Sequence, residues 1–453
     1  MQAGQTLDSS LTPIDVLRRW PADQPIALLH SGRPHPRWSR YSILAQPDGA
    51  IRFDGQTFQQ TGQPDRPCDD PFATLQSALD QEPQALYLGY LGYDLGRWVE
   101  DIPATARDDR PWPILQFERC PGWLVYDNLS PSWTGHGTWA NNHPLTELPP
   151  TDPDRPSTFH AEPARPEQTR TQFEASIQRV KDYIAAGDVF QANLAQRFTG
   201  RFTGQPRALF ASLAHQSPAW YGAYLELSPQ YPGEPRRTIA STSPELFLQC
   251  DPTGHITTRP IKGTLPADQP ADRLAASEKD AAELAMIVDL LRNDLGRVCR
   301  VGSIRIDQPR AIETHPTIHH GVATLNAQLA PGRRLIDLLR ATLPGGSITG
   351  APKVRSMQII EELEPNRRGP YCGAIGMIHG QAMTLNIAIR TLLLEQPNNR
   401  ADGRYQFSVG AGIVADSTPA AEYDETLSKA RAILNALASP KAHQTITQQQ
   451  AQQ

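Results

Sequence analysis

Short strand-like runs and longer amphipathic helices alternate along nearly the whole chain, and this alternation limits the fold more than any other feature. Before residue 150 the apolar runs are short and bounded by turn residues, at 25–32, 41–46 and 85–96. After residue 170 helical periodicity sets in, at 172–188 and again at 280–296, each ending near a glycine. The mixture predicts an α+β protein.

The remaining elements follow the same patterns. Residues 333–343 are expected to form a helix that Pro344 ends, and residues 419–438 a last helix with Thr418 as N-cap and Pro419 in its first position. Four further apolar runs are predicted to be strands: 223–227, 245–250, 383–395 and 405–416.

Composition divides the chain into regions. Residues 151–170 are rich in proline and charge and poor in apolar residues, which is typical of a linker between an N-terminal region, 1–150, and a larger region, 171–438. Residues 439–453 have low hydrophobicity and are expected to be a disordered tail. The sequence contains no internal repeat.

Charge and cysteine usage exclude several classes of protein. Lys and Arg (43) are fewer than Asp and Glu (48), with a net charge of -5 and no basic run, so a nucleic-acid partner is not expected. No apolar run reaches the roughly 18 to 20 residues that cross a bilayer, and the N-terminus lacks a secretory pattern. Five scattered cysteines without a C-x-x-C pair indicate reduced thiols, and the expected location is cytoplasmic.

Two predicted helices carry carboxylates at helical spacing. Glu422, Glu425 and Lys429 lie on one face, which could be an ordinary solvated Glu–Lys face or a place for a divalent metal beside an anion. Asp280 and Glu283 precede an apolar face, which could be a helix entering the core or a second set of metal ligands. Oxygen ligands from two helices would suit Mg²⁺.

Glycine-rich segments and cations form a second group of candidates. The segment 343–357 lacks the Lys-Ser/Thr that follows the last glycine of a P-loop, so a nucleotide loop is rejected, although Thr349 could contact a carboxylate. Gly410 and Gly412 would let a strand approach a ligand closely, and Arg390 offers a planar fork for a carboxylate. Each feature alone is more often structural; together with Lys262 they suggest a site for a small polyanion.

A series of motifs between residues 170 and 437 resembles the chorismate-utilising enzymes, a family that includes the anthranilate, aminodeoxychorismate, isochorismate and salicylate synthases. The matching stretches occur in family order, among them DVFQANLAQRF, STSPELF, RPIKGT, AAELAMIVDLLRNDLGRV, IHHGVATL, PGGSITGAPKVRSM, RGPYCGAIG, NIAIRT and GAGIVADSTPAAEYDETLSKA. The N-terminal LLHSG and YLGYLGYDLGRWVE resemble the anthranilate and aminodeoxychorismate enzymes. The resemblance implies a large mixed α/β sandwich of two sheet-containing subdomains around a central cleft.

The resemblance also implies roles for individual residues. Glu283 and Glu425 are expected to bind Mg²⁺, supported by Glu422 and Asp280, and the metal holds the ring carboxylate of chorismate. Glu245 is the expected general acid/base, with His320 as its partner. Contacts with the substrate are expected from Thr264, Thr349, Tyr371, Arg390, Gly410, Gly412 and Lys429.

Lys262 separates the branches of this family. The resemblance implies that anthranilate synthases usually carry alanine there and aminodeoxychorismate synthases carry P-I-K-G-T, as in this chain. Lys262 is then the nucleophile that attacks C2 of chorismate before ammonia attacks C4, and its pKa must be lowered for that role. Gln191 stands where isochorismate synthases have a lysine that activates water, which disfavours hydration. Anthranilate synthase component I remains the alternative enzyme. A non-catalytic ligand sensor is the alternative that is not an enzyme.

The source of ammonia is missing from the sequence. No segment resembles a glutaminase with a cysteine nucleophile in a Gly-rich elbow, so the resemblance implies a separate glutamine amidotransferase subunit. The LLHSG segment is similar to the part of the family that holds a bound tryptophan, and Ser31 is carried over as its contact.

Overall fold

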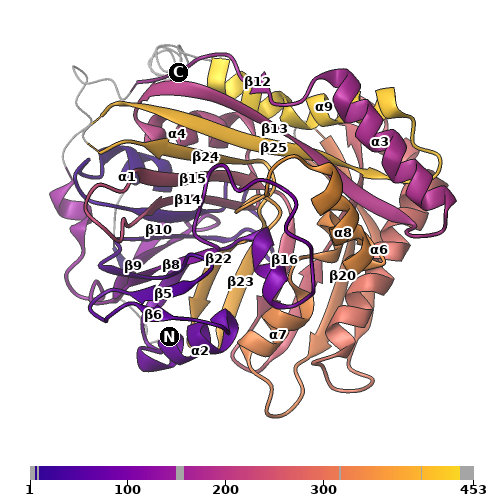
Figure 1. The fold of residues 1–453 in the computed structure, drawn as a ribbon. Coiled ribbons are helices and arrows are strands. Elements are labelled where there is room, and N and C mark those ends of the chain that lie inside the picture. Colours follow the sequence, from indigo (N-terminus) through magenta and orange to yellow (C-terminus); the bar gives the residue numbers. More distant parts are fainter. Residues whose placement is uncertain (1–5, 8–9, 149–157, 316–317, 399, 439–453) are drawn as a thin grey trace.

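The computed structural model describes residues 6–7, 10–148, 158–315, 318–398 and 400–438. Two large antiparallel sheets form the centre of the molecule and helices cover their outer faces (Figure 1). This arrangement confirms the α+β prediction. The predicted tail, 439–453, and most of the first half of the predicted linker lie outside the described residues.

Sheet 1 contains 13 strands in the described part of the chain. From one edge to the other they are β1 (Thr6–Leu7), β10 (Ser132–Gly137), β9 (Gly122–Asp127), β3 (Tyr41–Ala45), β2 (Ala27–His30), β14 (Tyr221–Leu227), β15 (Arg236–Ser243), β24 (Thr391–Gln396), β25 (Asp402–Ile413), β13 (Gln191–Gly204) and β11 (Phe159–Ala161). Two short strands, β12 (Arg165–Pro166) and β21 (Gly350–Ala351), also pair with β13.

Sheet 2 contains 12 strands among the same residues. Their order is β18 (Ile261–Pro266), β20 (Ile318–Gln328), β17 (His255–Arg259), β16 (Leu246–Cys250), β23 (Ala382–Ile387), β22 (Ala374–His379), β7 (Leu86–Leu91), β8 (Leu115–Cys120), β4 (Gly49–Phe53), β5 (Thr57–Gln60) and β6 (Arg66–Pro67). The long strand β19 (Arg305–Thr314) pairs with β20.

The N-terminal and C-terminal parts of the chain share both sheets. In sheet 1 they meet where β2 pairs with β14, and in sheet 2 where β7 pairs with β22. The residues between 158 and 166 continue sheet 1 by pairing with β13. Each sheet is therefore completed only when strands from both parts are present.

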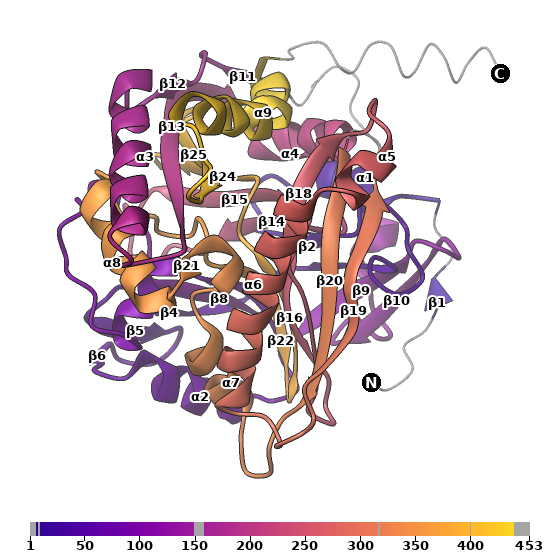
Figure 2. The same cartoon turned by 90° about the vertical axis from the view of Figure 1, so that its right-hand side faces the viewer.

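Helices pack on the outside of the two sheets. They are α1 (Pro13–Arg19), α2 (Pro71–Gln81), α3 (Arg170–Ala185), α4 (Pro206–Gln216), α5 (Ala271–Ala275), α6 (Glu278–Gly296), α7 (Leu335–Thr342), α8 (Lys353–Leu363) and α9 (Pro419–Ala438), with short 3-10 turns at Tyr93–Trp98, Pro144–Glu147 and Gly346–Ile348. Figure 2 shows α9 and α4 across sheet 1 and α6 running along β18 and β20.

Local sequence signals account for the ends of these helices. α3 begins with a capping box of Thr169 and Gln172, and the chain turns away at Gly187, whose φ is 85°. α6 begins where the Ser277 hydroxyl accepts a hydrogen bond from the Asp280 amide, and its buried face includes Ile287. α9 begins at Pro419, as predicted.

The prediction of one strand over residues 383–395 was wrong. The run is divided into β23 in sheet 2 and β24 in sheet 1, and the chain crosses between the sheets at residues 388–390. Arg390 adopts φ 51° at this crossing, a left-handed conformation that ends the extended run. Similarly, the run 85–96 contains only β7 before the 3-10 turn at Tyr93.

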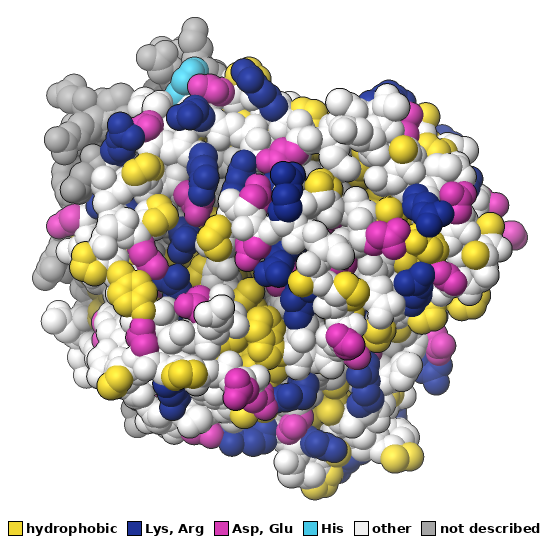
Figure 3. Space-filling model, viewed as in Figure 1, with side chains coloured by type: hydrophobic (Ala, Val, Ile, Leu, Met, Phe, Trp, Pro, Cys, Tyr) yellow, Lys and Arg dark blue, Asp and Glu magenta, His cyan; other side chains and the backbone are white. Residues whose placement is uncertain are grey.

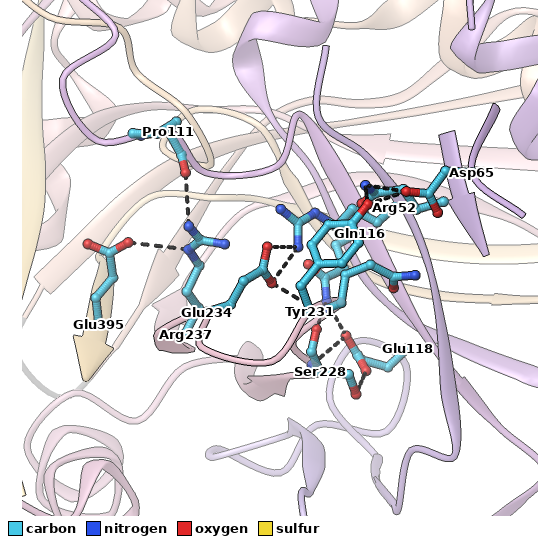
Figure 4. A network of polar contacts seen from close by, with 12 residues as sticks. Arg52, Asp65, Pro111, Gln116, Glu118, Ser228, Tyr231, Glu234, Arg237 and Glu395 are labelled. Carbon is cyan, nitrogen blue, oxygen red and sulfur yellow. Dashed lines mark hydrogen bonds and ion pairs between the residues drawn. The ribbon is translucent and has the colours of Figure 1, made fainter. Parts of the chain in front are cut away.

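A polar network holds the two sheets together on the side away from α6. Ser228, in the loop between β14 and β15, donates to Glu118 on β8 through both its amide (3.1 Å) and its hydroxyl (2.5 Å). In the same loop Glu234 pairs with Arg52 on β4 at 2.7 Å (Figure 4). Burial raises the pKa of Glu118 to about 7. A loop of sheet 1 is thus fixed onto two strands of sheet 2.

The described residues also bear on two compositional predictions. All five cysteines are buried and free, which confirms that they are unpaired. In the described part of the chain, none of the helices combines the length and the apolar character that crossing a membrane requires.

Candidate active site

Glu245 and Arg390 lie at two points where the chain crosses between the sheets. Glu245 stands between β15 and β16, and Arg390 between β23 and β24. The Ile387 amide donates to the Glu245 carbonyl at 3.1 Å, and the Thr242 amide donates to the Arg390 carbonyl at 3.1 Å. Hydrogen bonds between the two crossings therefore fix both side chains where the sheets approach each other.

The Glu245 carboxyl is buried, with 4% of the residue exposed. Burial raises the pKa of Glu245 to about 7, while the Ser347 hydroxyl, which donates to Oε1 at 2.6 Å, and the charge of Lys262 act in the opposite direction. A carboxyl group with this pKa is partly protonated near neutrality, so it can donate a proton as well as accept one.

Lys262 is carried by an irregularity at the edge of sheet 2. The pairing of β18 with β20 shifts register between Ile261 and Thr264, so residues 262 and 263 bulge out of the ladder. Gly263 has φ 80°, and a Cβ there would lie 2.9 Å from Cγ of Asp280. Burial lowers the pKa of Lys262; Glu283 opposes this shift and Lys429 adds to it. The bulge thus presents a lysine that loses its proton more easily than an exposed lysine does.

Two glycines of β25 allow the sheets to approach closely at this point. A Cβ at Gly412 would lie 2.6 Å from Nε2 of Gln191 and 3.4 Å from Nζ of Lys262. Gln191 is fully buried, and neither polar atom of its amide has a hydrogen-bond partner among the described residues. The space beside Gly412 is therefore bordered by an ammonium and an unsatisfied amide.

Gly410 brings Tyr371 and Lys429 to the same strand. A Cβ at Gly410 would lie 3.1 Å from the Tyr371 hydroxyl, and Nζ of Lys429 donates to the Gly410 carbonyl at 3.0 Å. The structure thus brings together the strand, Tyr371 and Lys429.

A second group of neighbouring side chains consists of Arg390, His320 and Thr264. Nη2 of Arg390 lies 3.4 Å from Nε2 of His320, whose Nδ1 lies 3.0 Å from the Thr264 hydroxyl. Burial lowers the pKa of Arg390 to about 10 and, together with the charge of Arg390, lowers the pKa of His320. In the described part of the chain no carboxylate pairs with Arg390. A half-buried guanidinium beside a neutral histidine is a suitable place for an anion.

The predicted metal ligands face one another from α6 and α9. Glu283 has 15% of its side chain exposed, and Glu422 accepts a 2.6 Å hydrogen bond from the Ser417 hydroxyl. Burial raises the pKa of both carboxyls, and the negative charge of Glu425 raises them further. Glu425 itself pairs with Lys429 at 2.7 Å, and Asp280 adds a charge beside Glu283. Burial acts to raise the pKa of Glu425 as well, but Lys429 and Lys262 lower it, so a bound cation would relieve repulsion mainly at Glu283 and Glu422.

The acidic cluster fits a weakly chelated ion. Among the described residues, no three His, Cys, Asp or Glu side chains are gathered closely enough to hold an ion by themselves. Mg²⁺ typically takes one or two protein carboxylates and completes its shell with water and an anionic substrate. Glu283 and Glu425 would supply those carboxylates, and Asp280 and Glu422 stand one helical turn before them.

The predicted Thr349 and Ser31, and the neighbouring Lys353, make hydrogen bonds within the protein. The buried Thr349 donates its hydroxyl to the Gly345 carbonyl at 3.0 Å. Lys353, beside the predicted carboxylate loop, is bonded to Asp294 on α6, so it is not available for a ligand. The Ser31 hydroxyl donates to the Tyr41 carbonyl at 2.7 Å, and its contacts are with β3.

Sequence reasoning missed Ser347. This buried hydroxyl is the side chain that donates to Glu245, yet it stands in a run of glycines and small residues where a serine is usually a turn residue. In the sequence, the one indication that Ser347 could matter is its place two residues before Thr349.

Comparison with known proteins identifies relatives along most of the chain. A family model described as chorismate binding enzyme matches residues 26–435. Aminodeoxychorismate synthase component 1 of Escherichia coli is 37% identical over 434 residues, covering 90% of this chain and 92% of that protein. Anthranilate synthase component 1 of Thermus thermophilus is 33% identical and covers 95% and 96%.

A solved structure agrees with the sequence relatives. The crystal structure of anthranilate synthase component I from Streptococcus pneumoniae has a TM-score of 0.74 and 29% sequence identity, and it covers 96% of this chain and 100% of that chain. The fold is therefore shared over nearly the full length.

Proposed function

The chain belongs to the chorismate binding enzyme family, and on that premise we propose that it aminates chorismate at C4 to give 4-amino-4-deoxychorismate. Several relatives that bear the name aminodeoxychorismate synthase component 1 support this choice. The number in that name also supports a second component, which we propose is a glutamine amidotransferase that supplies ammonia. The product would serve para-aminobenzoate and folate biosynthesis.

The observation that carries the proposal is the environment of Lys262. Its amine borders the space beside Gly412, and its pKa is lowered by burial and by the cation of Lys429. Glu245, which lies within electrostatic reach of Lys262, has a pKa of about 7. A lysine that loses its proton more easily than an exposed one, beside a carboxyl that can hold a proton, is the pair that nucleophilic displacement of a hydroxyl group requires.

In the first step the Lys262 amine attacks C2 of chorismate. The new C2–N bond forms, the ring double bonds shift, and the C4–O bond breaks. Glu245 gives its proton to the departing hydroxyl, which leaves as water, and the adduct is held on Lys262. His320, neutral beside Arg390, fits the partner role near the same hydroxyl.

In the second step ammonia attacks C4. The C4–N bond forms, the double bonds shift back, and the C2–N bond to Lys262 breaks, so the lysine leaves as an amine. The carboxylate form of Glu245 takes the proton that the new ammonium group loses, which restores the starting state.

The remaining residues hold the two carboxylates of the substrate. Arg390 and Tyr371, with the backbone of Gly410 and Gly412, are suited to the enolpyruvyl carboxylate, and Thr264 and Lys429 extend this polar surface. When bound by Glu283 and Glu425, Mg²⁺ would neutralise the ring carboxylate. The carboxylates of Glu422 and Asp280 would then stabilise that ion from behind.

A product assay tests the proposal. The purified chain is mixed with chorismate, Mg²⁺ and ammonium at alkaline pH, and the product is identified by chromatography and mass. We expect 4-amino-4-deoxychorismate from the wild type, a loss of at least about 100-fold in Lys262→Ala, and near wild-type activity in the exposed control Arg292→Ala. Release of fluorescent anthranilate, or an unchanged product and rate in Lys262→Ala, would contradict it.

Anthranilate synthesis is the second candidate, because relatives with that name also match most of the chain. That reaction would leave Lys262 without a covalent role. An intact protein spectrum recorded during turnover separates the two, since only the proposed route holds a chorismate-derived mass on the chain.

A further inference from the structure

One edge of β13 has a gap in its strand pairing next to the candidate site. β25 pairs with the opposite edge along nearly the whole strand, but on this edge the pairing with β21 ends at Ala192 and the pairing with β12 begins at Phe198. The gap includes Ala195, whose partner across the ladder with β25 is Gly410. The backbone groups in the gap therefore need partners other than a strand if β13 is to hold the glycines of β25 in place.

Two side chains fill this gap in place of a strand. Nη2 of Arg368 donates to the Asn193 carbonyl at 2.6 Å, and the Ala195 amide donates to Oε1 of Glu364 at 2.8 Å. Arg368 and Glu364 are also joined to each other, from Nε to Oε2 at 2.9 Å and from Nη2 to Oε1 at 2.6 Å. A guanidinium and a carboxylate thus supply the donor and the acceptor that a neighbouring strand would supply.

Arg368 also reaches the turn that carries Ser347. Its Nη1 donates to the Ile348 carbonyl at 3.0 Å. Ser347 is the preceding residue, and its hydroxyl donates to Oε1 of Glu245 at 2.6 Å. Because a guanidinium holds its donors in a rigid planar fork, the bonds to Ile348 and Asn193 together fix the distance between the turn and β13. Arg368 thus links β13 to the residue that restrains the pKa of Glu245.

The Arg368–Glu364 pair is buried, unlike ordinary surface charges. Figure 3 shows side chains of both signs interspersed on the face where Figure 1 draws β12 and β13. The neighbouring Arg367 pairs with Asp108 at 3.2 Å, and 26% and 43% of these side chains are exposed, against 3% for Arg368 and 7% for Glu364. Apolar side chains of similar volume often stabilise a fold as well as a buried ion pair does. The backbone groups that this pair fixes are therefore the better explanation of its presence.

On the proposed function, on which this inference rests, we propose that Arg368, held by Glu364, is a positioning residue for the proton transfer to the departing hydroxyl. It keeps the Ser347 turn at a fixed distance from β13, and Ser347 in turn orients the Glu245 carboxyl. Arg368 acts through Ser347 and does not itself exchange a proton with the substrate. Loss of its planar fork should therefore have the same consequence as loss of the Ser347 hydroxyl.

The test is the kcat–pH profile of Arg368→Lys with saturating ammonium. Lysine keeps a positive charge beside Glu364 but loses the fork that holds two carbonyls in one geometry. We expect kcat to fall by about 10- to 100-fold. The alkaline limb should move upward as far as in Ser347→Ala, because both variants lose the hydrogen bond that stabilises the Glu245 carboxylate. Adding Ser347→Ala to Arg368→Lys should move the limb no further, since the two changes act through one contact.

Arg207→Lys is the matched control. Arg207 is also buried, pairs with Glu226 at 2.7 Å and donates to the carbonyls of Trp20 and Gln24, and none of these residues belongs to the candidate site. This control should lower the melting temperature as Arg368→Lys does and leave the alkaline limb in place. An unmoved limb in Arg368→Lys, or a double variant in which the two shifts add, overturns the positioning role.

A second variant and a second measurement separate this inference from the proposed function. If Arg368→Lys does not fold, Arg368→Met combined with Glu364→Gln, which leaves no buried charge unpaired, is assayed with the same expectations. A wild-type chain that makes no C4-aminated product with ammonium overturns the proposed function. Amide hydrogen exchange of residues 191–197 and 346–350 then tests the link between the turn and β13. Faster exchange in Arg368→Lys than in Arg207→Lys supports it, and equal exchange overturns it.

Discussion

The Ser347 hydroxyl donates a 2.6 Å hydrogen bond to Oε1 of Glu245 at the point where the chain passes from sheet 1 to sheet 2. Burial raises the pKa of this carboxyl and the hydrogen bond restrains the rise, so that the two effects together leave it near 7. One serine therefore helps to set the pKa of the proton-donating group of the site. From the sequence alone this serine would be assigned to a turn.

Ser347→Ala should raise the pKa of Glu245 above about 7, because a hydrogen bond that stabilises the carboxylate is removed. The acid form would then persist to higher pH, and the alkaline limb of the kcat–pH profile should move upward. The measurement is the pH profile of product formation with saturating ammonium, beside the exposed control Ser130→Ala. An alkaline limb that stays in place, or moves to lower pH, would show that Ser347 does not restrain this group.

Gly412→Ala should reduce turnover without unfolding the protein. Its Cβ would lie 2.6 Å from the Gln191 amide and 3.4 Å from Lys262 Nζ, so the amide or the lysine must move. We expect kcat to fall by about 10- to 100-fold, since small misplacements of reacting groups have such effects. Gly296→Ala is the matched control because a Cβ there meets no atom within 4 Å. Equal rates in the two variants, with equal melting temperatures, would rule out a close approach at Gly412.

Glu283→Gln should weaken Mg²⁺ binding by at least about ten-fold, because one of the two ligand carboxylates is lost. Glu278→Gln, on the exposed first turn of the same helix, should leave it unchanged. Titration calorimetry of Mg²⁺ into the chain with a non-reacting chorismate analogue measures the affinity independently of turnover. Equal affinity in the two variants would remove Glu283 from the metal site.

The contribution of Glu118 to the stability of the wild type should fall as pH rises from 4.5 to about 7. The folded-state pKa of this carboxyl is about 7 against an ordinary value of 4.5, so the folded chain binds the proton more tightly. This contribution is therefore fully present below pH 4.5 and falls by up to about 3 kcal/mol as pH approaches 7. Glu118→Gln lacks this titration, so its deficit relative to wild type should shrink between pH 5 and pH 8.

Urea denaturation at several pH values measures this deficit. The exposed Glu82→Gln should follow the wild-type curve in parallel, since its carboxyl is on the surface. A constant difference between wild type and Glu118→Gln across the whole range would falsify the role given to the buried carboxyl.

Much of the fold could be predicted from local patterns. α3, α6 and α9 have clear periodicity and caps, and their ends fall within a few residues of the prediction. The break at Arg390 could not be predicted, because both β23 and β24 bury residues on both faces and no change of pattern marks the crossing.

The residues of the site also fall into those that the sequence predicts and those that it does not. Lys262, Glu245 and the glycines of β25 stand in recognisable motifs, and the structure brings them near one another. The contacts of Ser347 and Arg368 depend on which distant segments pack against them, and no spacing along the chain records that.

The sharing of both sheets by the two parts of the chain constrains the order in which the protein can be made. β2 pairs with β14, which is synthesised almost 200 residues later, and β7 pairs with β22, which is synthesised almost 300 residues later. During synthesis the early strands leave the ribosome with unpaired edges long before their partners exist. We therefore expect the chain to depend on chaperones during translation. We also expect the full chain to refold slowly compared with helical proteins of equal length.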